Sequence, residues 1–154
     1  LAGGVALVTT AHGDMRQGLI ATAVTSLSAD PRSLLVCVNE TASIHGAMTA
    51  ADAFCVNLLS NGQDGIAARF ASPKDRETRF EVGDWTTLTT GAPALRDAQV
   101  SFDCHAAGSA RFGTHTVFFG EIVALTDWGT ACDPLIYHDG RFRRLDDNPD
   151  QEAA

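Results

Sequence analysis

The chain has 154 residues, of which 45% are hydrophobic and 19% are charged, so it has enough apolar side chains for one folded domain with a core. Nineteen acidic residues outnumber eleven basic ones, and the resulting net charge of −8 argues against binding to nucleic acid. Every apolar run is as short as a strand, which argues against a membrane span. The sequence leaves open what precedes Leu1.

The first half of the chain has the composition of strands around one short helix. Four segments are rich in β-forming residues and are predicted as strands: 5–10, 18–28, 34–39 and 54–59. Segment 34–39 is apolar at almost every position, which predicts a strand buried on both faces. Ser43 is the predicted N-cap of a helix over residues 44–51, because apolar side chains recur there at helical spacing.

The second half of the chain begins with a predicted helix at 63–70 and a charged, irregular stretch at 71–84, a candidate loop or lid. Three more strands are predicted at 99–107, 115–125 and 135–138, with turns at 108–109, 112–113 and 139–140. We expect one domain over residues 1–145 and an acidic tail at 146–154. Many short strands with two short helices predict a mainly β fold, a closed or split antiparallel barrel rather than a doubly wound sheet.

The chain has four cysteines, at Cys37, Cys55, Cys104 and Cys132. None of them lies in a Cys-X-X-Cys pair, and three fall in apolar, strand-like runs. We therefore expect free, buried thiols in a reducing compartment, and a cytoplasmic location. Only Cys104 and His105 are adjacent metal-binding types, but neighbours on a strand face opposite sides, so no metal site is expected.

Thr22, Ser26 and Ser28 share one face if residues 18–28 form a regular strand. Such a row of hydroxyl groups offers a ligand hydrogen-bond donors and acceptors without adding charge. The competing interpretation is that threonine simply favours strands, and the pattern alone does not decide between the two.

Segment 39–45 joins a predicted strand to a predicted helix and carries two hydroxyl residues, Thr41 and Ser43. A helix N-terminus presents unpaired N–H groups with partial positive charge, so this segment is a candidate phosphate site. The competing interpretation is that Ser43 only caps the helix.

No two of the five histidines have the spacing of metal ligands on a helix. His115 follows a Gly-Thr turn and His138 precedes an Asp-Gly turn, and ligand sites of barrels form near such strand ends. The chain lacks the GxGxxG, P-loop and GxSxG motifs. A nicotinamide would therefore have to bind transiently, against another cofactor.

Several of these segments, in this order and spacing, resemble the short-chain flavin reductases that supply two-component monooxygenases. The segments are GLIATAVTSLS at 18–28, FCVNLLS at 54–60, VSFDC at 100–104 and GTHTVFFGE at 113–121. Within that family the chain is most similar to the reductase components of 4-hydroxyphenylacetate monooxygenase and of pyrimidine-utilisation oxygenases. The resemblance implies an antiparallel Greek-key split β-barrel with a few short helices, and a homodimer. It also implies hydride transfer from NADH or NADPH to FMN or FAD, and delivery of reduced flavin to a partner monooxygenase.

The resemblance further implies which residues contact each ligand. The flavin ring and ribityl chain would lie on the segment Thr22, Ala23, Val24, Thr25, Ser26 and Ser28, and its phosphate end on Asn39, Thr41, Ser43 and His45. Asn57, Arg69 and Phe70 match positions near the flavin, and His115 and His138 match positions facing the nicotinamide. Many relatives have Asn-Ser where this chain has Thr22-Ala23, a change that moves ring contacts toward backbone groups. Hydride transfer is the cofactors' own chemistry, so no catalytic side chain is expected.

Other functions remain open at this point. One is a flavin-binding protein or a reductase of another substrate, such as a corrinoid, with tightly held FMN; another is a barrel that binds no flavin. FMN and NADH are favoured, whereas the partner oxygenase is open. The extra phosphate of NADPH would need a basic group, and the candidates are Arg76, Arg79, Arg141 and Arg143. The competing interpretation is that these arginines are exposed surface residues that bind no ligand. Phe80 and Trp85 are predicted to pack on a partner subunit or in the core.

Overall fold

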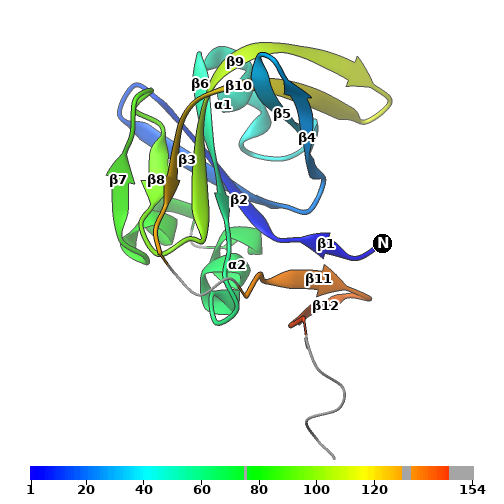
Figure 1. The fold of residues 1–154 in the computed structure, drawn as a ribbon, viewed down its shortest axis with the longest axis vertical. Helices are drawn as coiled ribbons and strands as arrows, with labels where there is room; N and C mark the ends of the chain where they lie inside the picture. The colour runs from blue at the N-terminus through cyan, green and yellow to red at the C-terminus, as the bar shows by residue number, and fades with distance from the viewer. Residues whose placement is uncertain (75, 130–132, 146–154) are drawn as a thin grey trace, which may run out of the picture.

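A seven-stranded antiparallel sheet forms the body of the computed structural model, which describes residues 1–74, 76–129 and 133–145 (Figure 1). In spatial order its strands are β3 (Met15–Ala21), β2 (Ala6–His12), β6 (Ala53–Leu58), β9 (Val100–Phe112), β10 (His115–Asp127), β5 (Arg32–Asn39) and β4 (Val24–Ala29). Within the described residues the two edge strands, β3 and β4, do not pair with each other, so the curved sheet stays open along one seam. The prediction of a mainly β, split antiparallel barrel is confirmed.

Shorter elements surround this sheet. The helices are α1 (His45–Ala50), α2 (Asp64–Ala71) and the 3₁₀ helix η1 (Arg76–Glu81). A three-stranded sheet joins β1 (Gly3–Gly4), β11 (Ile136–His138) and β12 (Arg141–Arg143), and a two-stranded sheet joins β7 (Trp85–Thr87) to β8 (Pro93–Leu95). The sequence indicated α1, α2 and β11, whereas η1, β7, β8 and β12 were not predicted, because each has six residues or fewer and no clear periodicity.

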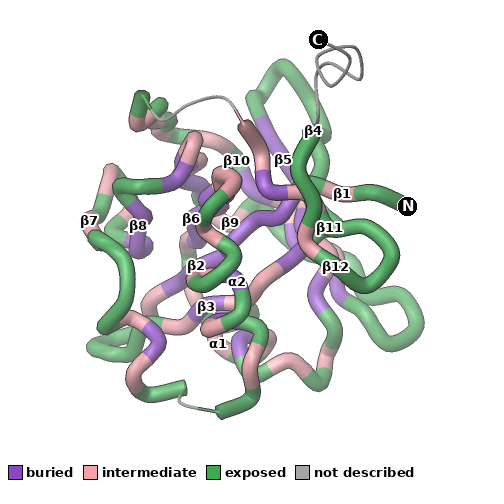
Figure 2. The backbone as a smooth tube through the Cα atoms, turned by 90° about the horizontal axis from the view of Figure 1, so that it is seen from below, coloured by how far each residue is buried: buried purple, intermediate pink, exposed green. Residues whose placement is uncertain are grey.

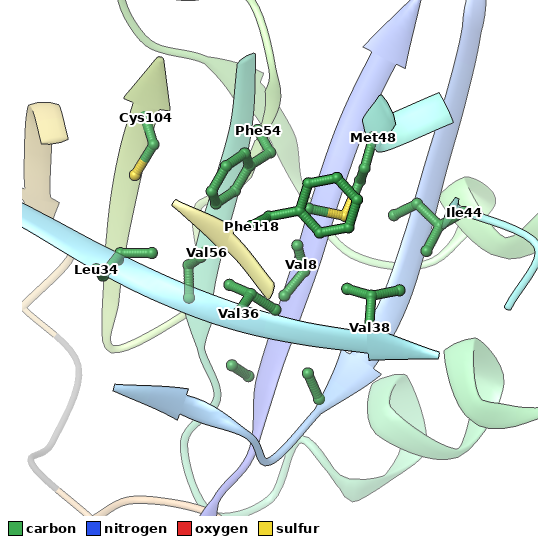
Figure 3. Packing of buried hydrophobic residues seen from close by; sticks show 12 residues of the cluster. Val8, Leu34, Val36, Val38, Ile44, Met48, Phe54, Val56, Cys104 and Phe118 are labelled. Carbon is green, nitrogen blue, oxygen red and sulfur yellow. The ribbon is translucent and has the colours of Figure 1, made fainter. Parts of the chain in front are cut away.

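The barrel interior is filled by apolar side chains from both halves of the chain (Figure 3). Its members include Val8, Val36, Val38, Phe54 and Phe118. On the other face of β2, a second cluster packs this strand against α2, and it contains Leu7, Leu59, Phe70 and Leu95. Strand β2 therefore contributes to both clusters through successive residues, as a strand between two layers must.

Strand β5 was predicted to be buried on both faces, and this prediction is wrong. Leu34, Val36 and Val38 are buried, but Leu35 and Cys37 between them are only half-buried. On that face Leu35 lies beside the exposed Thr25 of β4, a strand that is exposed along most of its length, so the surface of the sheet is open there (Figure 2). A strand covered on one side only alternates in burial.

The β9–β10 hairpin is longer than predicted, because β9 continues through the expected turn at 108–109 to Phe112. The register shifts between Phe119 and Gly120, so Ala106 and Gly108 face neighbouring residues of β10 and Ala107 is an extra residue. Such a bulge bends a strand, and Gly108 accommodates it with a φ of +130°. The turn expected at 112–113 is present at the hairpin tip.

The aromatic rings of Phe80 and Trp85 pack against Phe70, with ring centroids 5.2 and 5.8 Å from that of Phe70. Of the two environments considered for them, the structure therefore shows the core. Cys55 and Cys104 are buried free thiols, Cys37 is half-buried and free, and Cys132 and the predicted tail at 146–154 lie outside the described residues.

Candidate functional site

Two segments predicted to bind flavin meet at one end of the barrel, next to His115, which was predicted to face the nicotinamide. Because β4 and β5 are antiparallel, the start of β4 lies beside the end of β5, and Cys37 donates its N–H to the carbonyl of Ala23 at 3.0 Å. On the other side of β5, Asn39 faces His115, the first residue of β10. Thr22, Ala23 and Asn39 are all exposed there, so this end of the sheet offers polar groups to a ligand.

The 39–45 loop has a fixed shape. The side-chain oxygen of Asn39 accepts hydrogen bonds from the N–H and the hydroxyl of Thr41, both at 2.9 Å. The backbone carbonyl of Asn39 accepts another from the N–H of Ala42. An Asx turn of this kind orders a loop before any ligand arrives.

Ser43 does not cap helix α1, contrary to the prediction. The N-cap is Ile44, which makes no side-chain cap bond, and the helix has six residues. Within the described residues, the hydroxyl of Ser43 and the N–H groups of Ser43 and Ile44 have no hydrogen-bond partner. Ile44 is fully buried, so the loop keeps two accessible donors for a ligand, the hydroxyl and the N–H of the exposed Ser43. The loop itself rather than a helix dipole supplies them.

Glu40 is the one carboxylate of this loop, and an ion pair neutralises it. Arg111 from β9 contacts it in two places, with Nε 2.5 Å and Nη2 2.9 Å from its two carboxylate oxygens. The N–H of Glu40 also donates to the carbonyl of Thr114. These contacts hold the loop against the β9–β10 hairpin, and they remove a negative charge that would repel a phosphate.

The three candidate histidines have different environments. His45 is half-buried, with Nε2 2.8 Å from the Thr116 hydroxyl and its ring packed edge-on against Phe118, so it is held inward. His115 is exposed, next to Asn39. His138 is exposed on β11, one residue after Tyr137, which faces Gly3.

The strand β1 connects His138 to the predicted flavin segment. A Cβ added to Gly3 would lie 3.2 Å from the Cβ of Thr22, so Gly3 passes directly over that residue. Since Gly3 also faces Tyr137, the end of β11 lies on the Thr22 side of the site and His115 on the Asn39 side.

The hydroxyl row predicted on one face of a strand is not regular. Strand β4 begins only at Val24, and its register against β5 shifts between Ser26 and Ser28. The Ser28 hydroxyl is used in the following turn, where it bonds to the N–H and the carbonyl of Asp30. Thr25 and Ser26 remain exposed nearer the site, while Ser28 lies at the opposite end of β4.

Asn57 and Phe70 lie in the interior and not at this end of the barrel. Asn57 is fully buried, and its amide donates to the carbonyl of Leu7 and to the Thr9 hydroxyl and accepts from the N–H of Leu95 and the Ser101 hydroxyl. Phe70 is 1% exposed, and its ring lies so close to Gly18 that an added Cβ would be 2.5 Å from it. In this conformation both side chains are buried and support the fold.

Arg69 lies on α2 beside Phe70 and donates to the hydroxyl of Thr78 at 2.6 Å. It lines a surface hollow with Gln63 and Ile66 that contains no residue of the 39–45 loop. Of the residues predicted near the flavin, the fold therefore places Asn57, Arg69 and Phe70 apart from the loop, in addition to Ser28 at the far end of β4.

A cleft of about 590 Å³ adjoins the loop at Ser43. It lies between the turn that joins β2 to β3 and the 3₁₀ helix η1, and its lining includes Arg16, Arg76 and Arg79. The sequence had suggested exposed surface as the alternative for Arg79, but its side chain is only 7% exposed. Arg16 was not recognised from the sequence, because only the fold brings the β2–β3 turn next to η1.

The buried thiols are not reactive groups. Burial raises the pKa of Cys104 to about 12, and the negative charge of Asp103 adds to the effect. The pKa of Cys55 is also raised, mainly by burial. Both thiols are therefore neutral near pH 7. Among the described residues, no three His, Cys, Asp or Glu side chains are grouped to hold a metal ion. No helix in the described part of the chain is long and apolar enough to cross a membrane.

A mainly β split barrel with polar donors gathered at one end defines a class of small ligand-binding barrels, and comparison with known proteins gives the family. The chain belongs to the flavin reductase like domain family, whose pattern matches residues 1–146. It is 40% identical to the NADH-dependent FMN reductase RutF 1 of Methylorubrum extorquens strain PA1, over 100% of this chain and 76% of that protein. The family resemblance inferred from the sequence is confirmed.

Two solved structures have the same fold at this level of similarity. One is the NADH:FAD oxidoreductase SgcE6 of Streptomyces globisporus C-1027 in complex with NAD and FAD fragments, with a TM-score of 0.88 and 32% identity, covering 97% of this chain and 89% of that one. The other is nitrilotriacetate monooxygenase component B from Mycobacterium thermoresistibile, with a TM-score of 0.89 and 27% identity, covering 95% and 81%.

Proposed function

We propose that this chain is an NADH-dependent flavin reductase that uses FMN or FAD and delivers the reduced flavin to a partner monooxygenase. The observation that carries the proposal is the loop at 39–45, where the exposed hydroxyl and N–H of Ser43 have no partner within the described residues and the carboxylate of Glu40 is neutralised by Arg111. A phosphate monoester fits such a set of donors, because it has several acceptor oxygens and needs no nearby carboxylate.

In this proposal the flavin supplies the redox chemistry by accepting a hydride from the nicotinamide at its ring. The chain's own residues bind and orient. Thr22, Ala23, Val24, Thr25 and Ser26 offer hydroxyl and backbone groups to the ring, and Asn39, Thr41 and Ser43 form the phosphate end. His45 braces the loop from inside, through Thr116. His115 and His138, both exposed, are the proposed contacts on the nicotinamide side.

The first experiment follows the absorbance at 340 nm with NADH and catalytic protein, with and without FMN and then FAD. Flavin-dependent loss of NADH is expected. No loss, with yellow flavin retained by the protein, would favour a tightly held flavin that serves another substrate. No loss and no bound flavin would contradict the proposal. Flavin binding itself is read from the melting temperature, since a ligand at a hundredfold excess over its Kd stabilises by about 2.7 kcal/mol.

The loop is tested by Ser43→Ala, which removes the unpartnered hydroxyl. Loss of one hydrogen bond to a ligand costs about 0.5–1.5 kcal/mol, so KM for FMN should rise about threefold to tenfold. The matched control is Ser109→Ala, an exposed serine on β9 outside the loop. Equal KM values for the two variants would mean that the phosphate does not bind at Ser43.

We further propose that the chain forms a homodimer and works in a reducing, cytoplasmic setting. Three large apolar side chains on β4 and β10 are exposed by more than a third, at Leu27, Val123 and Leu125. A second copy of the chain would bury them. The free thiols of Cys55 and Cys104 fit a reducing compartment. Light scattering on the purified protein measures the mass in solution, and a monomer at micromolar concentration would contradict the dimer.

A further inference from the structure

Among the residues that the structure describes, the lining of the cleft next to Ser43 carries an excess of positive charge. Three arginines line it, against two carboxylates, those of Asp14 and Glu77. Within the described residues, none of the three arginines forms an ion pair. This is unusual in a chain with nineteen acidic and eleven basic residues, where carboxylates are the commoner neighbours.

Arg79 is the buried member of the set. Its guanidinium donates to the carbonyls of Ser72 and Gly18, and its Nε is buried without a hydrogen-bond partner. Burial, followed by repulsion from Arg76, lowers the pKa of Arg79. A buried cation that lacks an anion is costly, so the fold maintains this charge beneath the cleft at the expense of stability.

The other two arginines stand on the walls of the cleft. Arg16 lies over the ring of Phe80, with the guanidinium carbon 4.7 Å from the ring centroid, so its charge is held in place. Arg76 is the first residue of η1 and is exposed. An anion entering the cleft would meet Arg16 and Arg76 directly and would compensate the charge of Arg79 below.

The position of the cleft identifies the kind of anion. Ser43 belongs both to the loop and to the cleft lining, so a ligand with its first phosphate at Ser43 continues into the cleft. The volume of about 590 Å³ is within the range of small-molecule sites, about 300–1,000 Å³. Arginines recognise phosphates through planar, paired hydrogen bonds.

We propose that this cleft binds the second phosphate and the adenylate end of a dinucleotide, while the loop holds the first phosphate. The inference rests on the proposed function and adds a subsite to it. FAD and NADH share this adenylate chemistry, and an FMN molecule lacks it. The cleft thus either distinguishes FAD from FMN or binds the adenylate end of NADH.

The test measures ADP binding by titration calorimetry, which requires no turnover. The double variant Arg16→Gln/Arg76→Gln changes two wall residues, of which Arg76 is exposed, and so should leave the fold intact. We expect its Kd for ADP to be at least tenfold higher than that of the unmodified protein, and the unmodified protein to bind ADP more weakly as salt rises. The matched control is Arg32→Gln, an exposed arginine outside the cleft, which should keep the original Kd. A double variant within twofold of the original Kd, or an equal loss in the control, would overturn the proposal.

Steady-state kinetics of the same double variant then identify the source of the adenylate. A higher KM for FAD than for FMN, relative to the unmodified protein, assigns the cleft to FAD. A higher KM for NADH with either flavin assigns it to the nicotinamide donor. Weaker ADP binding with neither change would refute a role for the cleft in binding a substrate dinucleotide. If the unmodified protein oxidises no NADH with either flavin, the proposed function fails, and the ADP titration still reports on the cleft.

Discussion

Replacement of Asn57 by leucine should strongly destabilise the protein and leave its ligand site intact. The Asn57 amide joins four groups from β2, β8 and β9, and the N–H of Leu95 depends on it at 2.9 Å. Leucine has a similar volume but cannot hydrogen-bond. A buried N–H left without a partner costs about 1–3 kcal/mol, and the Thr9 and Ser101 hydroxyls lose one of their bonds as well. We expect a total loss of about 3 kcal/mol in the free energy of unfolding.

For a chain of 154 residues, 1 kcal/mol shifts Tm by about 2–4 °C, so Asn57→Leu should lower Tm by roughly 6–12 °C in calorimetry. The matched control is Asn61→Leu, which removes a half-buried amide that bonds to Asp133 at 3.0 Å and should cost less than about 1 kcal/mol. Measured at 10 °C, the Kd of the Asn57 variant for FMN should stay within about twofold of the original. An unchanged Tm would refute the stabilising role of Asn57. A folded variant that has lost FMN binding would show that Asn57 also contacts the flavin.

Three further changes test packing and burial. Gly120→Val should cost about 2–4 kcal/mol, measured by urea unfolding, because an added Cβ would lie 2.6 Å from the Phe54 ring. Gly46→Ala should stabilise the protein by up to about 1 kcal/mol, since that helical position has open space, and destabilisation would contradict the packing seen in α1. Cys55 and Cys104 should resist iodoacetamide at pH 8 in peptide mapping of the folded protein. Because the pKa values of both thiols are raised in the folded protein, only the unfolded chain loses the thiol protons just above pH 9. The free energy of unfolding should therefore fall by about 1 kcal/mol per thiol for each further pH unit.

Local sequence was sufficient for the strands with a strong apolar pattern and insufficient for their environment. The prediction of segment 34–39 as a strand is confirmed, but whether its second face is covered depends on how distant segments pack on the sheet, which its own residues do not show. The hairpin shows the same limit. Gly108 and Ser109 have the composition of a turn, yet β10 provides pairing partners for both of them. The chain therefore forms a bulge at Ala107 and Gly108 instead of a turn.

For the candidate site, the sequence indicated the loop and the start of β4 but not their relation to the interior. Asn57 was assigned to the flavin because of its place in a family segment. Its partners Leu7, Leu95 and Ser101 are 50, 38 and 44 residues away in sequence, and no local pattern reveals such a network. Ser28 matched the hydroxyl pattern, but the bulge before it and the turn after it remove its hydroxyl from the row.

The choice between FMN and FAD should depend on the arginine cleft and not on the ring segment. The two flavins share the ring, the ribityl chain and the first phosphate, so Thr22, Ala23 and Ser43 meet the same atoms in both. The difference begins beyond the first phosphate, and the charge next to Ser43 comes from Arg16, Arg76 and the buried Arg79. Changes at the start of β4 should therefore alter the KM values for both flavins in parallel. Changes in the cleft should alter their ratio, unless the cleft serves NADH, in which case the ratio stays constant and the KM for NADH rises.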